Sequence, residues 1–316
     1  MSSLLGQLRT GEFESLGIQA IGTGFEPLDS VLDGGFLPGE VILLGGQPGA
    51  GKTICALQWA RTIASAGRRT AFACFEHDEA TLLTRLLVQE AAGLATDHNP
   101  IERFEARTII RDLFLGLITI EDAVAGSSLV EEAMEAMDEF SSNLQLLRAS
   151  SQRTTPIALN ALSAEGLEAG GVLFVDYLQK LPIPEVANLE ERVYRAVEVL
   201  KELAIDHQVT VVALSAAAGT GIGVDRLRLE HLRGSDALAH ECDVAILMNQ
   251  KVTATSDRHL KFDLTQLDEA RRRTVFSIEK NRRGEVDLHL EFEKDFANFR
   301  FMPDGAFVTE TLEGDQ

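Results

Sequence analysis

Short apolar runs rich in β-branched residues alternate along this chain with longer segments in which apolar residues recur every three or four positions. The first pattern is typical of buried strands and the second of amphipathic helices. Because strands that alternate with helices usually form a parallel sheet covered by helices on both faces, we expect an α/β fold. The strands are expected at residues 41–46, 69–76, 144–149, 171–177, 209–215, 243–250 and 274–281, and the helices at residues 52–66, 78–93, 128–140, 156–168 and 189–207.

Two segments depart from this alternation. Residues 97–142 are helical in pattern and carry many more acidic than basic residues, which indicates a solvated helical insertion or, as an alternative, a surface for a protein partner. Residues 216–238 are rich in glycine and then in arginine, and we expect a functional loop there. Residues 17–302 are expected to form one domain, with a flexible acidic tail at residues 303–316.

Composition limits the classes of function. The formal net charge is −20, which works against indiscriminate binding of nucleic acid, so any contact with DNA must come from a local basic patch. No apolar run approaches the roughly 18 residues of a membrane helix, and the N-terminus does not resemble a signal peptide, so we expect a cytoplasmic protein without membrane contact. Three cysteines lie in apolar segments without metal-ligand spacing and are expected to be reduced core residues: Cys55, Cys74 and Cys242.

A glycine-rich stretch between an expected strand and an expected helix fits the P-loop pattern GxxxxGK[ST]. Its glycines allow successive backbone N–H groups to face a phosphate, Lys52 supplies positive charge, and the Thr53 hydroxyl is a ligand for Mg²⁺. ATP and Mg²⁺ are therefore the expected cofactors. The nucleotide-binding residues are expected to be Gly46, Gln47, Pro48, Gly49, Ala50, Gly51, Lys52 and Thr53.

Two acidic residues at strand ends complete the expected catalytic set. Asp176 ends the apolar run 171–177 and is the candidate carboxylate on the metal side. Glu76 ends the run 69–76 and is the candidate that orients and deprotonates water, because carboxyl ends of parallel strands converge on the ligand crevice. Asp78 and Glu79 are also near, but they fall at a helix start, where acids commonly act as caps.

The order of motifs resembles that of the RecA-like ATPase domain of bacterial DnaB-type replicative helicases. The motifs are GTGFEPLDSVLDGGFLPGE, GGQPGAGKT, FEHDEATLLTRLL, VLFVDYLQ, VTVVALS, LRGSDALAHECD and EKNRRG. The similarity runs from about Gly17 to Phe301; DYLQ and the KxRxG pattern are its most specific parts. It implies a RecA-like P-loop NTPase, a hexameric ring of identical subunits, and action on single-stranded DNA. Residues 1–16 would then be a stub of the linker helix that docks on a neighbouring subunit.

The resemblance also implies roles for individual residues. Lys52 and Thr53 take the P-loop roles, Glu76 activates water, and Asp176 lies on the Mg²⁺ side. Lys280 and Arg282 match a basic pair that reaches the γ-phosphate bound by a neighbouring subunit, where an arginine neutralises charge in the transition state.

Two positions depart from the family pattern. Ala216 stands where the family usually carries a glutamine that relays between the γ-phosphate and the DNA loop. In the DNA loop itself, the candidate contacts are balanced by acidic residues, and the loop lacks an aromatic residue for stacking on bases. These candidate DNA-binding residues are Arg226, Arg228 and Arg233.

Three functions fit these features. The first is an ATP-driven ring that moves on single-stranded DNA. The second is a non-motor switch with a fold similar to that of KaiC or RadA relatives, which assembles with ATP and recruits a protein partner; Ala216 and the acidic segment 97–142 favour it. The third, a small-molecule kinase, shares the P-loop but has no use for a trans-acting arginine. We expect the motor.

Overall fold

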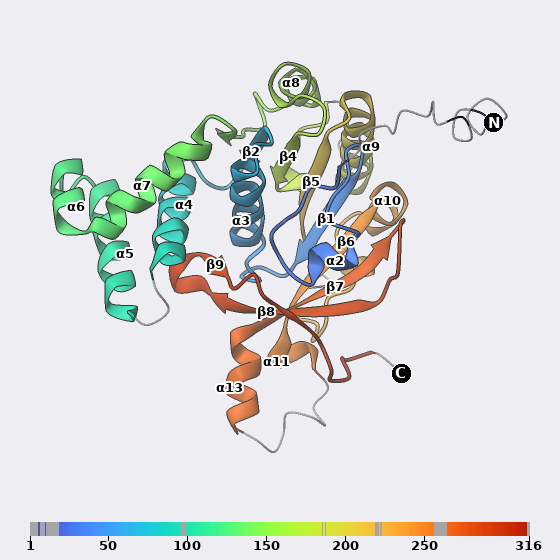
Figure 1. Ribbon diagram of the computed structural model, residues 1–316. Coiled ribbons are helices and arrows are strands. Elements are labelled where there is room, and N and C mark those ends of the chain that lie inside the picture. Colours follow the sequence, from blue (N-terminus) through green and yellow to red (C-terminus); the bar gives the residue numbers. More distant parts are fainter. Residues whose placement is uncertain are drawn as a thin grey trace.

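The computed structural model shows a central sheet with helices on both faces and a helical lobe at one side (Figure 1). It describes residues 19–95, 99–184, 188–218, 223–255 and 264–314, together with Gly6, Thr10, Val186 and Gly221. The proposed linker stub, residues 1–16, therefore lies almost entirely outside the described residues.

The sheet runs in the order β10-β8-β7-β6-β1-β5-β4-β2-β3, and β9 pairs with β8 outside this path. The six strands from β6 to β3 are parallel, whereas β7, β8 and β10 extend one edge in antiparallel pairing. The expected mostly parallel α/β sheet is thus confirmed. The strands are β1 (Val41–Gly46), β2 (Thr70–Cys74), β3 (Leu144–Arg148), β4 (Val172–Asp176), β5 (Thr210–Ala216), β6 (Val244–Gln250), β7 (Arg273–Asn281), β8 (Leu288–Asp295), β9 (Arg300–Phe301) and β10 (Ala306–Phe307).

Strand side chains alternate between two cores because successive residues of a strand face opposite sides of the sheet. On one face, Ile42 and Leu44 pack with Trp59 of α3. On the other, Val41 and Leu43 pack with the apolar stripe of α9. The helices are α2 (Leu28–Val31), α3 (Lys52–Ser65), α4 (Glu79–Leu94), α5 (Pro100–Phe114), α6 (Ile120–Gly126), α7 (Ser128–Ser141), α8 (Pro156–Leu162), α9 (Leu189–His207), α10 (Ser235–Glu241), α11 (Lys251–Ala254) and α13 (Leu264–Arg272).

Residues 97–142 hold helices α5, α6 and α7, as expected, and these helices pack with α4 as a lobe (Figure 1). Their buried residues form a small core of their own with α4, including Leu87, Ala106, Ile110 and Val130. The lobe therefore has an apolar interior that the acidic composition of the segment did not reveal.

Two expectations about irregular segments were wrong in part. The segment 216–238 is not a loop throughout: it contains a 3-10 turn at Leu229–His231, and α10 begins at Ser235. The tail is packed where it is described. β10 pairs with β8, Leu312 is buried, and Glu310 forms an ion pair with Lys251 over 2.7 Å. These contacts depend on partners in β8 and α11, so the local polarity of the tail gave no sign of them.

Candidate functional site

The P-loop lies between β1 and α3, at the carboxyl end of the central strand. Gly51 precedes α3 with φ of 93°, a conformation that glycine adopts without strain, and a β-carbon there would lie 2.6 Å from the Phe296 ring. No side chain caps α3 within the described chain, so the amides of its first turn are open to an anion. The loop therefore has the backbone geometry that a phosphate group requires.

The ammonium group of Lys52 lies inside the curl of the P-loop. Its Nζ donates to the carbonyl oxygens of Gly46, at 2.7 Å, and Gln47, at 3.1 Å. Burial lowers the pKa of Lys52, while the negative charges of Asp176 and Glu76 oppose that shift. A bound phosphate would supply the counter-charge that the buried ammonium lacks in its own loop.

Thr53 and Asp176 meet at the edge of the P-loop although they are 123 residues apart. The Thr53 hydroxyl donates to Asp176 Oδ2 at 2.7 Å, and Asp176 ends the buried strand β4. Burial raises the pKa of Asp176, and the Thr53 hydrogen bond works in the opposite direction. A hydroxyl and a carboxylate are oxygen donors of the kind that Mg²⁺ prefers, so the pair fits that ion.

Glu76 follows the end of β2, and its side chain is exposed. The register pairs Cys74 with Asp176, so Glu76 lies at the same edge of the sheet as the metal-side carboxylate. In addition to burial, the negative charge of Glu76 raises the pKa of Asp176, which reflects their proximity. As expected, Asp78 caps α4, because its side chain accepts from the Thr81 amide at 2.8 Å.

Gln179 is a site residue whose role the sequence did not reveal. Its Nε2 donates to Ser215 Oγ at 2.8 Å, and its Oε1 accepts from the Ala216 amide at 3.3 Å. Ala216 is in turn the register partner of Gly46, where the P-loop begins. Gln179 therefore ties the end of β4 to the strand beside the P-loop. The DYLQ motif contains this glutamine, but only the fold shows its partners.

Lys280 and Arg282 lie at the opposite end of the sheet from the P-loop of their own chain. β7 is antiparallel to β6, so Lys280 pairs with Ala245 near the start of β6, whereas Gly46 pairs with Met248 toward its end. Lys280 donates to the carbonyls of Ala239 and His240. Arg282 donates to Asp243 at 3.0 Å, and its side chain is 47% exposed. Neither cation approaches the phosphate-binding loop of the same chain.

The structure does not bring the three candidate DNA-binding arginines together on the surface. Arg226 is 5% exposed and donates to the backbone oxygen of Glu313 at 3.1 Å. Arg228 is half-buried and lies beside Gly314, whereas Arg233 is exposed just before α10. Arg226 therefore holds the C-terminal segment in this conformation, because a guanidinium at that depth is not available to a phosphate backbone. The residues Gly219, Thr220 and Ile222 of the same segment lie outside the described residues.

Comparison with known proteins identifies the family. The model of the DnaB-like helicase C-terminal domain matches residues 20–301. This chain belongs to that family. DnaB-like helicases of this family are P-loop NTPases, and the P-loop geometry above agrees with that membership. The resemblance expected from the motif order is thus confirmed over nearly the whole chain.

Relatives and solved structures agree with this membership. The chain is 26% identical over 286 residues to the replicative DNA helicase DnaB of Treponema pallidum, covering 88% of this chain and 55% of that protein. The chain thus spans about half the length of that relative. Two solved structures share the fold at 18% identity. One is an isolated ATPase domain, with a TM-score of 0.70 over 95% of this chain and 97% of that chain. The other is a DnaB-like replicative helicase, with a TM-score of 0.72 over 95% and 67%.

Two further observations bear on this DnaB-like domain. Among the described residues, no three His, Cys, Asp or Glu side chains cluster as a metal site, so a metal ion would rely on Thr53, Asp176 and the nucleotide together. No helix within the described ranges is both long and apolar enough to cross a membrane.

Proposed function

We propose that this chain is the ATP-hydrolysing domain of a ring of identical subunits, six by analogy with the family, that moves on single-stranded DNA. One observation carries the proposal: a complete P-loop with its metal-side pair lies at one end of the sheet, and an exposed arginine lies at the other. A head-to-tail ring brings these two ends together between neighbouring subunits.

Each residue has a distinct task in the proposed site. The amides of residues 46–53 and Lys52 bind the phosphates of ATP, and Thr53 with Asp176 holds Mg²⁺. The ion, when bound, neutralises charge that develops on the phosphates. Glu76 orients water and accepts its proton. Arg282 of one subunit stabilises the transition state in the next, assisted by Lys280.

Turnover measured with and without oligo-dT tests the motor. Single-stranded DNA is expected to raise the ATPase rate, and binding is expected to weaken as salt rises, because Arg233 contacts phosphates. Lys52→Ala is expected to abolish turnover, because it removes the charge that faces the β- and γ-phosphates. Absence of both DNA binding at low salt and DNA stimulation, with an active ATPase, would contradict the motor.

A second function, an ATP-dependent switch that recruits a protein partner, is favoured by the burial of Arg226 and by Ala216. With Arg226 turned inward, the chain offers less positive charge to DNA than the three arginines suggested. In a switch, ATP changes the oligomeric state without stimulation by DNA. Electron microscopy with a slowly hydrolysed ATP analogue, with and without oligo-dT, separates the two functions, because only the motor encloses DNA.

A further inference from the structure

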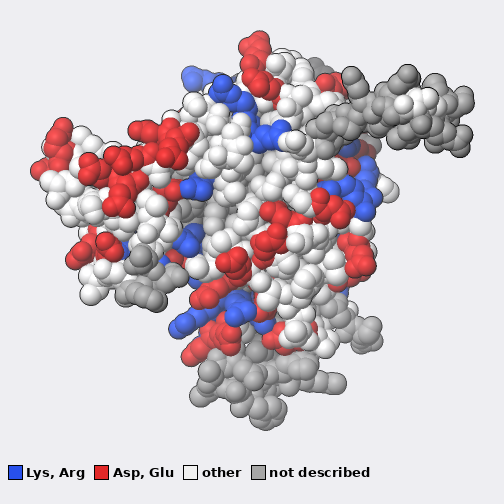
Figure 2. All heavy atoms as spheres, in the orientation of Figure 1, with Lys and Arg blue, Asp and Glu red and all other residues white. Residues whose placement is uncertain are grey.

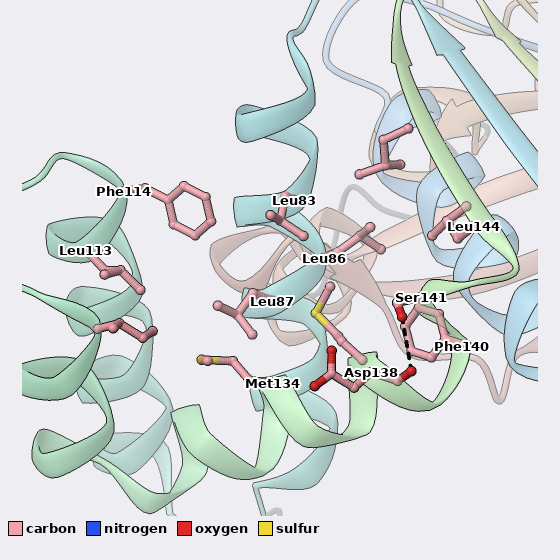
Figure 3. Close-up of a pocket in the computed structure, with 13 residues that line it drawn as sticks. Leu83, Leu86, Leu87, Leu113, Phe114, Met134, Asp138, Phe140, Ser141 and Leu144 are labelled. Carbon is pink, nitrogen blue, oxygen red and sulfur yellow. Dashed lines mark hydrogen bonds between the residues drawn. The ribbon is translucent and has the colours of Figure 1, made fainter.

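The helical lobe contains an apolar groove at the surface, distinct from the P-loop. It has a volume of about 350 Å³ and lies between helices α4, α5 and α7 and the edge strand β3 (Figure 3). Leu83, Leu86 and Leu87 of α4 form its floor, with Phe114 on one side and Met134 on another. Leu83 and Phe114 are 41% and 36% exposed, so the groove is open to solvent.

The lining of this groove does not suit a small polar ligand. Its polar members are Asp138 and Ser141, and the Ser141 hydroxyl is already bonded to the backbone oxygen of Asp138 at 3.1 Å. Small-molecule sites carry several converging polar groups that fix orientation. Two methionines, Met134 and Met137, instead provide flexible apolar contacts of the kind found at protein-binding surfaces.

The helix that forms one wall of the groove is strongly acidic. α7 carries five acidic residues and no basic residue, and within the described ranges none of these acids forms an ion pair. Glu131 and Asp138 recur with Met134 at helical spacing, so they lie along the side of α7 that faces the groove. Figure 2 shows acidic side chains gathered over α6 and α7. The groove therefore combines an apolar floor with a negative rim.

The end of α7 also lacks charge compensation. The carboxyl end of a helix carries a partial negative charge, which basic residues stabilise and acidic residues oppose. Asp138 and Glu139 occupy the last turn of α7, which holds no basic residue. A positively charged partner at this position would relieve that repulsion. A second copy of the chain does not meet this need, because every copy carries the same net charge of −20.

We propose that this groove binds a basic amphipathic helix of another protein. Two or three apolar side chains of that helix fill the groove, and lysines or arginines beside them face the acids of α7. The walls of the groove are mostly helical, and an amphipathic helix presents anchors at positions i, i+3, i+4 and i+7 that match such a groove. The interaction needs no nucleotide, so it stands independently of the ATPase function proposed above.

Fluorescence anisotropy with a labelled synthetic peptide tests the proposal on the whole chain. The probe has about 18 residues, or five turns, with leucines at i, i+3, i+4 and i+7 and lysines beside them. One control peptide replaces the lysines by glutamates, and another has a central proline that breaks the helix. The basic helical peptide is expected to bind, with affinity that falls as salt rises, and both control peptides are expected to bind at least about tenfold more weakly.

Variants of the chain locate the binding site. Leu83→Asp is expected to weaken binding at least about tenfold, because it places a charge in the apolar floor. Asp138→Lys is expected to weaken binding and to reduce its salt dependence, since it removes rim charge. Ile157→Asp, at an 82% exposed position on α8, is the matched control and is expected to bind as the unaltered chain does. ATPase activity and thermal melting of each variant confirm that it is folded.

Three outcomes would overturn the proposal. Equal binding of the acidic and basic peptides would remove the role of α7, and equal binding of the proline peptide would favour an extended partner along the edge strand β3. Unchanged affinity in both Leu83→Asp and Asp138→Lys would place the peptide elsewhere. Self-association of the chain that these two variants abolish would instead assign the groove to a second copy.

Discussion

Arg282 donates a hydrogen bond to Asp243 at 3.0 Å, at the end of the sheet opposite to the P-loop of the same chain. Asp243 is buried, and it also accepts from Lys201 and from the Val41 amide. This arrangement holds the base of the β7–β8 turn against the start of β6, while the Arg282 side chain keeps 47% of its surface exposed. The guanidinium is thus anchored near a surface that a neighbouring subunit can cover.

Arg282→Ala is expected to lower turnover of the assembled protein by about 10³-fold or more, with nucleotide affinity unchanged, because the arginine acts only on the transition state. Steady-state ATPase rates over a range of protein concentrations measure this, with nucleotide binding assayed separately. Arg111→Ala, at an exposed arginine of α5, serves as the control.

Mixing two inactive variants gives a sharper test of the trans assignment. A subunit with Lys52→Ala still offers Arg282, and a subunit with Arg282→Ala still offers an intact P-loop. Their mixture is expected to regain part of the activity at the mixed interfaces. Failure to regain any activity, in a mixture shown to co-assemble, would place Arg282 outside the neighbour's site.

Glu76→Gln is expected to lower the rate of hydrolysis by about 10²- to 10⁴-fold, because the amide cannot accept a proton from water. Binding of ATP is expected to persist, since Glu76 lies beyond the P-loop. Rapid-quench and equilibrium-binding measurements separate the two steps. Glu79→Gln is the matched control, because Glu79 accepts from the Arg148 amide and serves the structure. Equal losses in both variants would argue against a special role for Glu76.

Asp176→Asn is expected to stabilise the protein without nucleotide while it impairs hydrolysis. Burial raises the pKa of Asp176, so its ionisation is less favourable in the folded than in the unfolded chain. The stability that goes with the protonated form is complete below the unfolded pKa of about 3.9 and is lost as the pH rises through the higher folded pKa.

The advantage of the asparagine variant should therefore grow with pH. Urea unfolding at about pH 5 and about pH 8 compares the variant with the unaltered chain. Asp206→Asn, at an exposed position of α9, is the control and is expected to show no such trend. A variant that is less stable than the unaltered chain at both pH values would contradict the assigned effect of burial.

Gln179→Ala is expected to destabilise the fold by about 1–3 kcal/mol, because it leaves the buried Ser215 hydroxyl and the Ala216 amide without their partner. Urea denaturation measures the loss. Gln145→Ala, on the exposed face of β3, is expected to change stability by less than about 0.5 kcal/mol. The double variant Gln179→Leu with Ser215→Ala should lose less than the sum of the single losses, since both polar partners are removed.

The local pattern determined the strands, the main helices and the P-loop, because their signals lie within a few consecutive residues. Apolar patterning predicted β1 and α9, and the GxxxxGK[ST] spacing predicted the geometry at Gly51. The motif order also predicted the family, which the comparison confirmed. Lys52 and Thr53 lie where the motif places them.

The tertiary structure alone decided which distant groups meet. The contact of Thr53 with Asp176 spans 123 residues, and the bond from Gln179 reaches Ser215 on another strand. The inward turn of Arg226 and the docking of residues 303–314 depend on partners far along the chain. The groove beside α7 likewise arises only when several elements pack together. Sequence patterns report the local preferences of the backbone, whereas these contacts follow from how the sheet and its helices close around a shared core.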